Sequence, residues 1–375
     1  MLGGGQLGRM FAHAAQALGY KVLVLDPDTL SPAGAVADRH LQAHYENAAA
    51  LDELARVCAA VTTEFENVPA GAMEQLARRI PARPAAQSLR IAQDREQEKY
   101  FLANNGFALA PYRVLRSESD CTGIAPELLP GIVKTARLGY DGKGQVNVRT
   151  DADVANAFRS LDTQPCVLEQ RVPLALEISA LVARSSSGET AVWPLAENSH
   201  RNGILDVSIV PARIPDSLAA EARAAGMRIA DRVDYVGVLC VEMFVSTNHG
   251  LLINEIAPRP HNSGHWSIDG SFTSQFEQQC RVLAGLPLGD TSQHTAAVMV
   301  NLLGDVWYGA GGTEAAREPD WNSVLADPRA KLHLYGKRDA RRGRKMGHVT
   351  CLGGSVDSAL AVAARIKRAL GIPDA

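Results

Sequence analysis

The segment VLCVEMFVSTNHGLLINE, residues 238–255, contains two apolar strands joined by a polar turn, and each strand includes a glutamate. Because strand side chains alternate between faces, Glu242 lies on a face that is otherwise apolar. A four-residue turn, Thr247 to Gly250, places Glu242 opposite Glu255, whereas a five-residue turn places it opposite Asn254. The segment therefore predicts an antiparallel hairpin on which two carboxylates, or a carboxylate and an amide, converge.

Two carboxylates this close repel, so either one of them holds a proton or a cation lies between them. Mg²⁺ is the natural cation, since it prefers oxygen ligands and commonly joins one or two carboxylates to substrate phosphates. We therefore expect Glu242 and Glu255 to hold magnesium. The alternative is a pair of solvated glutamates on an edge strand.

A polar loop, IAPRPHNSGHW at residues 256–266, follows this hairpin directly and contains two prolines. Arg259 offers a planar fork for a carboxylate-like or carbonate-like anion, and His261 can donate or accept a proton near neutral pH. A lone histidine is more often structural. Beside a metal site, this loop indicates an anion site.

A glycine-rich loop, RLGYDGKGQ at residues 137–145, joins two predicted strands. Its spacing does not match a Walker A loop, so it is interpreted as a flap that closes over phosphates, or else as a solvated hairpin. Lys134 lies on the apolar strand just before it, where a buried lysine requires an anionic partner.

The chain begins with a second glycine turn, GGGQLG at residues 3–8, followed by an Ala-rich helix and a strand that ends at Asp26. This pattern matches a dinucleotide fingerprint, in which backbone amides approach phosphate at a helix N-terminus. The glycines could instead serve only tight packing. Only two residues precede them, so the first strand is nearly absent and the natural protein is expected to begin earlier.

A basic cluster near the C-terminus, GKRDARRGRKMGH at residues 336–348, has six basic residues within nine positions. A solvated turn is the common explanation of such a run. A formal net charge of −3 and the lack of interleaved aromatic residues disfavour nucleic-acid binding, whereas one phosphate on a small substrate would suit two or three of these cations.

The composition is that of an ordinary globular enzyme, with 375 residues, 46% hydrophobic residues and 21% charged residues. The six cysteines are scattered without metal-binding spacing, and no apolar run is long enough to span a bilayer. We expect a cytoplasmic protein with reduced thiols.

The pattern of helices and strands changes near Gln93, from parallel α/β layering to hairpins with interspersed helices. Three domains are predicted, at residues 1–93, 94–286 and 287–375. The predicted strands of the second domain are 132–134, 145–148, 167–170, 177–184, 238–245 and 251–256, and its predicted helices are 94–104, 151–161 and 217–233. A final helix is predicted at 355–370.

Four separated motifs, taken along the chain, resemble the ATP-grasp superfamily, and within it the N5-carboxyaminoimidazole ribonucleotide synthetases of purine biosynthesis. They are the glycine loop with Lys134, residues 168–172, the hairpin at 242–255 and residues 254–266. The resemblance rests on residues 139–145 and 254–266 above all, and it extends from residues 3–10 to residues 343–348. It implies an ATP-grasp fold, with an N-terminal Rossmann-like domain of parallel strands and a small, β-rich C-terminal domain.

The resemblance also implies a role for each motif. ATP lies between two β-rich lobes, and carboxyphosphate forms from ATP and bicarbonate. Its carbon then passes, directly or as CO₂, to the amine of aminoimidazole ribonucleotide. The implied nucleotide-binding residues are Arg95, Lys134, Gly139, Tyr140, Asp141, Gly142, Lys143, Gly144, Gln145, Glu169, Gln170, Arg171, Val172, Glu177, His200, Asn254 and Glu255. The implied catalytic residues are Arg259, His261, Asn262, Ser263 and Asp141. The implied ribonucleotide-binding residues are Gly5, Gln6, Leu7, Tyr140, Lys337, Arg344 and Lys345.

The resemblance thus implies a homodimeric ligase with ATP as co-substrate and Mg²⁺ as cofactor. Three alternatives remain open. One is the formate-using transformylase of the same pathway, for which a stretch like Pro-His-Asp-Thr-Gly is expected where this chain has PHNSG at residues 260–264. Another is an NAD-dependent oxidoreductase, which the first thirty residues alone allow. The last is a non-catalytic nucleotide sensor, which the retention of Lys134, Glu242 and Glu255 disfavours.

Overall fold

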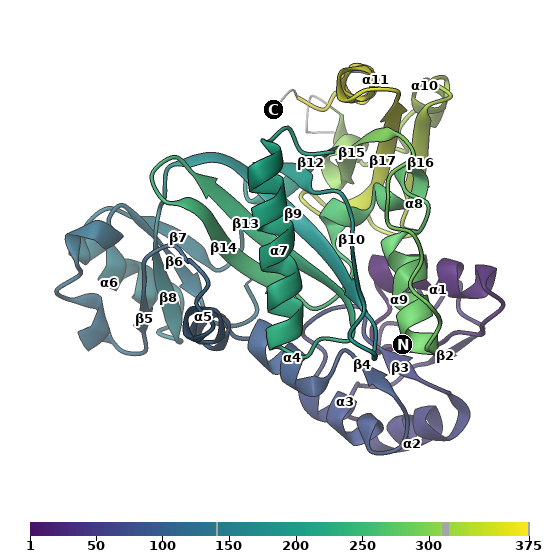
Figure 1. Cartoon of the computed structure of the whole chain (residues 1–375), viewed down its shortest axis with the longest axis horizontal. Coiled ribbons are helices and arrows are strands. Elements are labelled where there is room, and N and C mark those ends of the chain that lie inside the picture. Colours follow the sequence, from purple (N-terminus) through teal and green to yellow (C-terminus); the bar gives the residue numbers. More distant parts are fainter. Residues whose placement is uncertain (140–141, 310–314, 374–375) are drawn as a thin grey trace.

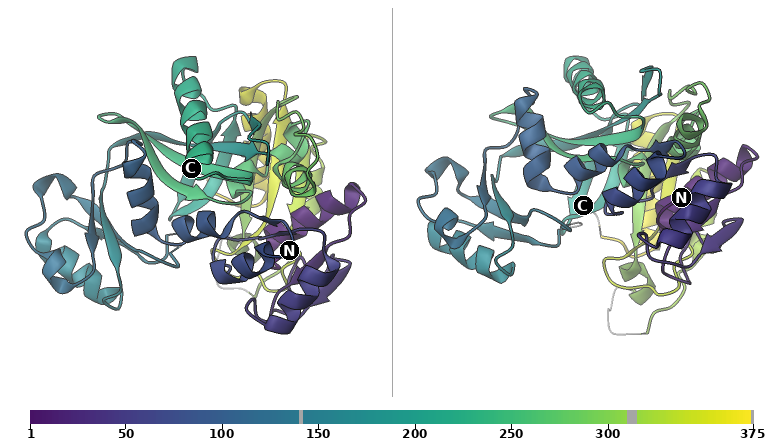
Figure 2. Two further views of the ribbon diagram at one scale, coloured as in Figure 1. Left: turned by 60° about the horizontal axis from the view of Figure 1, so that its bottom comes forward. Right: turned by 90° about the horizontal axis from the view of Figure 1, so that it is seen from below.

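The computed structural model describes residues 1–139, 142–309 and 315–373, and it shows a mixed α/β protein in which most strand pairs are antiparallel. A four-stranded sheet lies at one end of the molecule, and the N-terminal elements lie toward the other (Figures 1 and 2). A nine-stranded sheet lies between them and extends into the C-terminal region.

Parallel strand pairs characterise the N-terminal region, as the sequence predicts. Strand β1 (Leu23–Leu25) pairs with β2 (Arg39–Leu41), and β3 (Val61–Thr62) pairs with β4 (Ala82–Arg83). Leu2 joins the two pairs, because it forms parallel bridges to Leu25 and to Thr63. Leu2 therefore occupies the position of the expected first strand, between β1 and β3. The helices here are α1 (Gln6–Ala17), α2 (Ala48–Val57), α3 (Ala70–Ala77) and α4 (Ala86–Ala92).

The four-stranded sheet has the order β5-β8-β6-β7 and is antiparallel throughout. Its strands are β5 (Tyr112–Leu115), β6 (Gly131–Thr135), β7 (Gln145–Val148) and β8 (Cys166–Gln170). Helix α6 (Asp151–Ser160) covers one face, where Val154, Ala157 and Phe158 are buried against the strands. Helix α5 (Arg95–Asn104) is capped at its N-terminus by Asp94, whose carboxylate accepts hydrogen bonds from the backbone amides of Glu96 and Gln97.

The nine-stranded sheet has the order β14-β13-β9-β11-β12-β15-β17-β16, with β10 paired to β9. Its strands are β9 (Leu174–Arg184), β10 (Thr190–Val192), β11 (Ala196–Arg201), β12 (Ile204–Val210), β13 (Gly237–Ser246), β14 (Gly250–Ala257), β15 (Ala296–Leu303), β16 (Ala330–Leu334) and β17 (Lys345–Gly353). The sheet passes from β12 to β15 by direct pairing, so the predicted boundary at residue 287 does not interrupt it.

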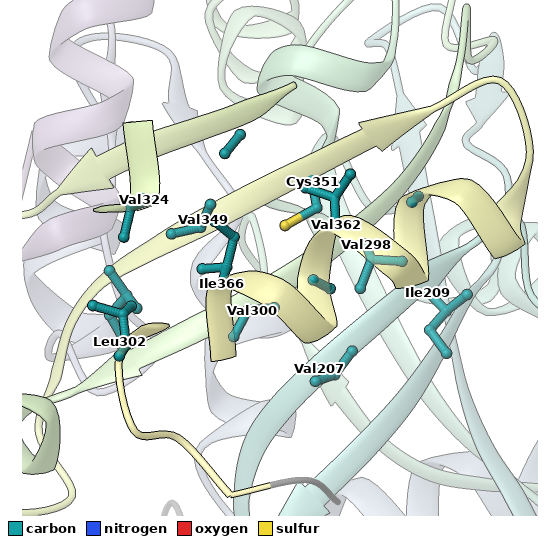
Figure 3. Close-up of a cluster of buried hydrophobic side chains, with 14 of the residues drawn as sticks. Val207, Ile209, Val298, Val300, Leu302, Val324, Val349, Cys351, Val362 and Ile366 are labelled. Carbon is teal, nitrogen blue, oxygen red and sulfur yellow. The ribbon is translucent and has the colours of Figure 1, made fainter. Parts of the chain in front are cut away.

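Helices cover this sheet and form its cores. Helix α7 (Asp216–Arg232) packs on β9 and β13, while α11 (Val356–Ala369) packs on β15 and β17. Figure 3 shows Val362 and Ile366 of α11 above the valines of these strands. The other helices are α8 (Ser267–Gly270), α9 (Gln275–Ala284) and α10 (Trp321–Leu325), with 3-10 turns at Glu118–Cys121, Pro126–Leu128, Asn262–Gly264 and Gly304–Tyr308.

Every helix and strand predicted for residues 94–286 is present, with ends that differ by at most three residues. The register of the β13–β14 hairpin corrects one expectation. Ser246 pairs with Gly250, so the turn has three residues and neither a four-residue nor a five-residue turn is right. An irregularity beside Glu242 then leaves Asn254 unpaired, and beyond it Glu242 pairs with Glu255 as predicted.

All six cysteines are free, as expected for unpaired thiols. Among the helices in the described residues, none combines the length and the apolar character needed to cross a bilayer.

Candidate active site

The carboxylates of Glu242 and Glu255 face each other across β13 and β14. Arg95 lies beside them, with its Nη1 atom 3.0 Å from Oε2 of Glu255. The side chain of Glu242 is 14% exposed and that of Glu255 is 34% exposed, so the pair lies at a partly open surface. A ligand can therefore reach both carboxylates.

The electrostatics of this pair are asymmetric. Burial and the charge of Glu255 raise the pKa of Glu242. Burial also disfavours ionisation of Glu255, but Arg95 and Lys134 outweigh it and lower the pKa of that residue. Glu242 therefore tends to hold a proton unless a cation compensates it.

The donor set fits a hard cation such as Mg²⁺. Besides the two carboxylates, the side-chain oxygen of Asn254 is buried without a hydrogen-bond partner in the part of the chain that the structure describes. Within that part, no group of three or more His, Cys, Asp or Glu side chains could hold a metal. A pair of carboxylates is nevertheless the usual protein contribution to a magnesium site that substrate phosphates complete.

The loop after β14 brings His261 to the hairpin, with its Nε2 atom 3.6 Å from Oε1 of Glu242. The other ring nitrogen lies 2.9 Å from Oγ of Ser263, which lies 2.7 Å from Oγ of Ser179 on β9. Burial and the nearby Arg259 hold the pKa of His261 well below its usual range. The imidazole is therefore neutral at pH 7, with its orientation fixed by the serines.

Arg259 is held by the N-terminal region, because its Nε atom donates a hydrogen bond to the carboxylate of Glu66. Its Nη1 atom also donates to the carbonyl oxygen of Pro260 at 3.2 Å. The amide of Asn262 exchanges hydrogen bonds with Asn301 on β15. The predicted anion loop is thus anchored by the N-terminal region and by strand β15.

On the nucleotide side, Lys134 has the anionic partner that its burial requires. Its Nζ atom lies 3.0 Å from Oε2 of Glu169 on β8, and Nζ of Lys99 lies 3.3 Å from the other carboxylate oxygen. Burial opposes ionisation of Glu169, but Lys134 and Lys99 lower its pKa to about 2. Glu169 is therefore charged at any physiological pH.

The segment after Glu169 is held by backbone hydrogen bonds. The amide of Gln170 donates to the carbonyl of Pro111 at 2.8 Å, and that of Arg171 donates to Pro130 at 2.9 Å. Val172 is buried against Ala110 and Leu252. The backbone of the predicted adenine segment is therefore fixed from both sides.

Glu177 and His200 form a pair across neighbouring strands β9 and β11, with 3.0 Å between Oε2 and Nδ1. Burial opposes protonation of His200, but the hydrogen bond and charge of Glu177 raise its pKa. Protonation of His200 is thus favoured by its partner, and the pair lies near the hairpin, since the charge of Glu242 also acts on His200.

The glycine loop turns back toward the nine-stranded sheet. A Cβ atom on Gly142, which has φ +77°, would lie 3.2 Å from the carbonyl oxygen of Asn202 in the β11–β12 turn. Gly139, Lys143, Gly144 and Gln145 complete the described part of the loop. Tyr140 and Asp141 lie outside the described residues.

The segment that contains Lys337 lies close to the first glycine turn. The amide of Gly5 donates to the carboxylate of Glu64, just before α1 begins at Gln6 and Leu7. Burial raises the pKa of Glu64 to about 7, and the charges of Arg259 and Lys337 oppose that rise. Lys337 is therefore close enough to interact with this carboxylate.

Two further basic residues of the C-terminal cluster have defined places. The Nζ atom of Lys337 donates to the carbonyl of Lys345 at 2.6 Å, and the charge of Lys345 acts on His200 and His261. Arg344 donates to the carbonyl of Asp339 at 2.9 Å, within its own loop. Lys337 and Lys345 are thus brought together with the rest of the site, whereas the contact of Arg344 is local.

Sequence reasoning missed four charged residues that the structure places here: Glu64, Glu66, Glu98 and Lys99. Glu64 and Glu66 follow strand β3, at the edge where parallel sheets commonly place ligand-binding groups, so they could have been found. Lys99 is one helical turn after Arg95 and could have been found from that spacing. Nothing in the local sequence names Glu169 as its partner.

Comparison with known proteins identifies three matching family models. Residues 1–93 match the ribonucleotide synthetase preATP-grasp domain, and residues 100–276 match the ATP-grasp domain. Residues 297–362 match the phosphoribosylaminoimidazole carboxylase C-terminal domain.

Individual proteins agree with these models. The chain is 44% identical over 353 residues to an N5-carboxyaminoimidazole ribonucleotide synthase of Brucella melitensis, covering 93% of this chain and 94% of the relative. The crystal structure of an ADP complex of N5-carboxyaminoimidazole ribonucleotide synthetase superimposes with a TM-score of 0.90 at 42% identity, covering 99% of this chain and 95% of the other. The Aspergillus clavatus enzyme in complex with ADP and 5-aminoimidazole ribonucleotide gives a TM-score of 0.88 at 29% identity, with 99% and 97% covered.

Proposed function

The chain belongs to the N5-carboxyaminoimidazole ribonucleotide synthase family, and we propose that it carboxylates 5-aminoimidazole ribonucleotide in a reaction that consumes ATP and bicarbonate. It is therefore an ATP-dependent ligase of purine biosynthesis. The observation that supports this most directly is the Glu242 and Glu255 pair beside the Arg259 and His261 loop, within an ATP-grasp fold.

The proposed reaction has two steps. A bicarbonate oxygen attacks the terminal phosphorus of ATP, so that the bond from this phosphorus to the bridging oxygen breaks and ADP leaves. The product is carboxyphosphate. The exocyclic amine of the ribonucleotide then attacks its carbon, or CO₂ released from it, while phosphate leaves and the amine loses a proton.

The anion loop would bind and orient bicarbonate. Arg259, fixed through Nε by Glu66, has guanidinium nitrogens for the anion, and Asn262 and Ser263 add polar groups beside it. Neutral His261 can accept a proton from bicarbonate or from the amine. Asp141, which the family resemblance places near the amine, is proposed as a further catalytic group.

Mg²⁺ would be held by Glu242 and Glu255. When bound, the ion neutralises charge on the phosphates of ATP during phosphoryl transfer. Glu255 would remain ionised for this role because Arg95 stabilises its charge.

ATP would lie between the four-stranded sheet and the hairpin. The proposed phosphate contacts are Arg95, Lys134, His200, Asn254 and the loop Gly139 to Gln145, including Tyr140. Glu169, Gln170, Arg171 and Val172 would meet adenine, and Glu177 would meet the ribose. The Glu169 carboxylate is already held by two lysines, so its backbone is the part of the residue available to adenine.

The ribonucleotide would lie between the first glycine turn and the basic cluster at residues 337–345. Gly5, Gln6 and Leu7 would meet it from the first glycine turn, and Lys337, Arg344 and Lys345 would bind its phosphate. Tyr140 and Asp141 would face the aminoimidazole. The nearness of Lys337 to Glu64 beside Gly5 supports this placement.

For the domain organisation, we propose three domains at residues 1–93, 94–286 and 287–375. The first is Rossmann-like, and the last is small and β-rich. We also propose a cytoplasmic homodimer, for which the molar mass in solution is the test. The match of residues 1–93 to a ribonucleotide synthetase domain favours a ribonucleotide, rather than NAD, at the first glycine turn.

Phosphate release is the direct test of this function. We expect release to require Mg²⁺, bicarbonate and aminoimidazole ribonucleotide together, with ¹³C from bicarbonate appearing in the ribonucleotide product. Phosphate release that continues unchanged when the ribonucleotide is omitted would count against the proposal. Replacing bicarbonate by formate, and aminoimidazole ribonucleotide by glycinamide ribonucleotide, tests the transformylase reaction in the same assay.

A further inference from the structure

Helix α5 lies between the two sheets of the site and contacts both of them (Figure 1). One stripe of this helix consists of Arg95, Glu98, Lys99 and Leu102, at the spacing of residues that share a helix face. Glu98 is 2% exposed and Lys99 is 1% exposed. Two buried charged residues that make no proposed contact with substrate require a structural or positioning explanation.

On the hairpin side, Glu98 binds the edge strand of the nine-stranded sheet. Strand β14 is the last strand at this edge. The backbone amide of Ile256 points outward from β14 and donates to Oε1 of Glu98 at 2.6 Å. Ile256 follows Glu255, so Glu98 fixes the backbone that carries one of the two facing carboxylates.

On the nucleotide side, the same helix binds the four-stranded sheet. Nζ of Lys99 lies 3.3 Å from Oε1 of Glu169 and 5.6 Å from the centre of the Tyr112 ring on β5. The amide of Arg95 donates to the carbonyl of Ala136, just after β6, at 2.8 Å. The helix therefore fixes the strands that present Lys134 and the predicted adenine segment.

We propose that Glu98 and Lys99 are positioning residues for phosphoryl transfer, and that α5 sets the placement of the nucleotide strands relative to the carboxylate hairpin. The proposal rests on the proposed function for the identity of the substrates. Its physical basis is the fixed geometry that phosphoryl transfer needs, because displacement of a reacting group by about 1 Å can lower the rate by about a hundredfold. Lys99 acts through Glu169, and Glu98 acts through the backbone of Ile256.

The two residues are expected to have separable effects. In Lys99→Met, one oxygen of Glu169 loses its ionic partner, and ADP affinity decreases by about tenfold. In Glu98→Leu, the amide of Ile256 loses its acceptor, and the magnesium concentration for half-maximal activity rises by about tenfold. Glu98→Gln keeps an acceptor oxygen for that amide and stays close to the wild type.

Isothermal calorimetry with ADP, in the absence of bicarbonate and ribonucleotide, tests Lys99 independently of the proposed reaction. Weaker ADP binding by Lys99→Met supports the positioning role even if the carboxylation assay fails. Tyr100→Ala is the matched control, because Tyr100 is on the same helix and is 67% exposed. Unchanged ADP affinity in a folded Lys99→Met variant would overturn the assignment of Lys99.

A double variant distinguishes positioning through Glu169 from a general loss of stability. If Lys99 acts through Glu169, adding Lys99→Met to Glu169→Gln weakens ADP binding little further. If the decreases in ADP affinity caused by the two substitutions multiply in full in the double variant, Lys99 does not act through Glu169. If Lys99→Met does not fold, Lys99→Gln is the second variant, because it keeps a hydrogen-bond donor without the charge. It is also expected to weaken ADP binding. Wild-type ADP affinity in Lys99→Gln would overturn the assignment as well.

Magnesium dependence provides the corresponding test for Glu98. A role in folding alone would lower the melting temperature of Glu98→Leu without changing the half-maximal magnesium concentration of the folded fraction. That outcome would overturn the assignment of Glu98. A higher magnesium requirement, restored by Glu98→Gln, supports it.

Discussion

The carboxylate hairpin, which is partly exposed, and the Glu169 cluster, which is buried, balance their charges differently. At the hairpin, Glu242 faces a second carboxylate, whose effect on its pKa outweighs that of His200, and it lies 3.6 Å from the neutral imidazole of His261. At the cluster, each oxygen of Glu169 has its own lysine. The cluster is thus compensated within the protein, while the hairpin is compensated fully only by a proton or a bound cation.

This difference decides which of the two groups can respond to ligands and pH. Burial and Glu255 raise the pKa of Glu242, so its proton can leave when a cation arrives. Lys134 and Lys99 outweigh burial and lower the pKa of Glu169 to about 2, so that its charge is constant near pH 7. The hairpin is suited to chemistry and the cluster is suited to holding structure.

The largest expected effect is the loss of turnover in Glu255→Gln. Removing this carboxylate withdraws several kcal/mol of stabilisation from the transferring phosphoryl group, which corresponds to at least about a hundredfold in kcat. Steady-state phosphate release at saturating ATP measures it. Activity equal to the wild type would refute the assignment of Glu255 to magnesium.

Lys134→Met is expected to have the next largest effect, on the nucleotide rather than on the metal. Glu169 keeps Lys99 but loses its partner at 3.0 Å, and ATP loses a proposed phosphate contact, so the KM for ATP rises by about tenfold or more. Saturation curves at several magnesium concentrations measure it. Full rescue by excess Mg²⁺ would remove the contrast between cluster and hairpin.

The sequence predicted the hairpin better than the cluster because the two carboxylates are close along the chain. Strand alternation and turn length sufficed to pair Glu242 with Glu255, although the turn is shorter than expected and Asn254 is unpaired. The pairing was right because the irregularity at Asn254 offsets the shorter turn. Such irregularities depend on tertiary contacts, which a pattern of alternating residues does not report.

The cluster shows what sequence patterns leave open. The burial of Lys134 predicted an anionic partner, and Glu169 is that partner. Residues that are distant in sequence form these pairs: Lys134 and Lys99 with Glu169, and Arg259 with Glu66. Only the fold brings these residues together, so the separate strand and helix patterns could not name the pairs.

A smaller effect is the release of a proton when Mg²⁺ binds. At pH 7, the wild type is expected to release up to about one proton from the hairpin, because metal ligands must be deprotonated. Calorimetric titration in two buffers of different ionisation enthalpy measures the number. Glu242→Gln has no proton to release at that position, so equal release by this variant and the wild type would contradict the assignment to Glu242.

The smallest expected effect is on the pH dependence of stability without metal. The raised pKa of Glu242 means that the folded state binds more protons than the unfolded state between about pH 4.5 and the raised value. Unfolding free energy therefore decreases as pH rises through that window. Glu169 has a lowered pKa, so its stabilising charge is lost only as pH falls toward about 2, and it contributes no slope near neutrality.

Thermal unfolding in EDTA at pH 5.5 and pH 8 tests this contrast. Glu64 and Glu98 also have raised pKa values, about 7 and about 8, mainly because of burial, and they contribute a slope of the same sign as Glu242. Three histidines have pKa values lowered mainly by burial and contribute a slope of the opposite sign: His261, His265 and His348. The test is therefore the difference between variant and wild type, at roughly 1 °C for each kcal/mol in a chain of 375 residues. Glu242→Gln is expected to melt higher at pH 8, relative to pH 5.5, than the wild type does, and Glu169→Gln leaves the slope unchanged. A slope that depends on Glu169 instead would reverse the distinction between a hairpin that titrates and a cluster that does not.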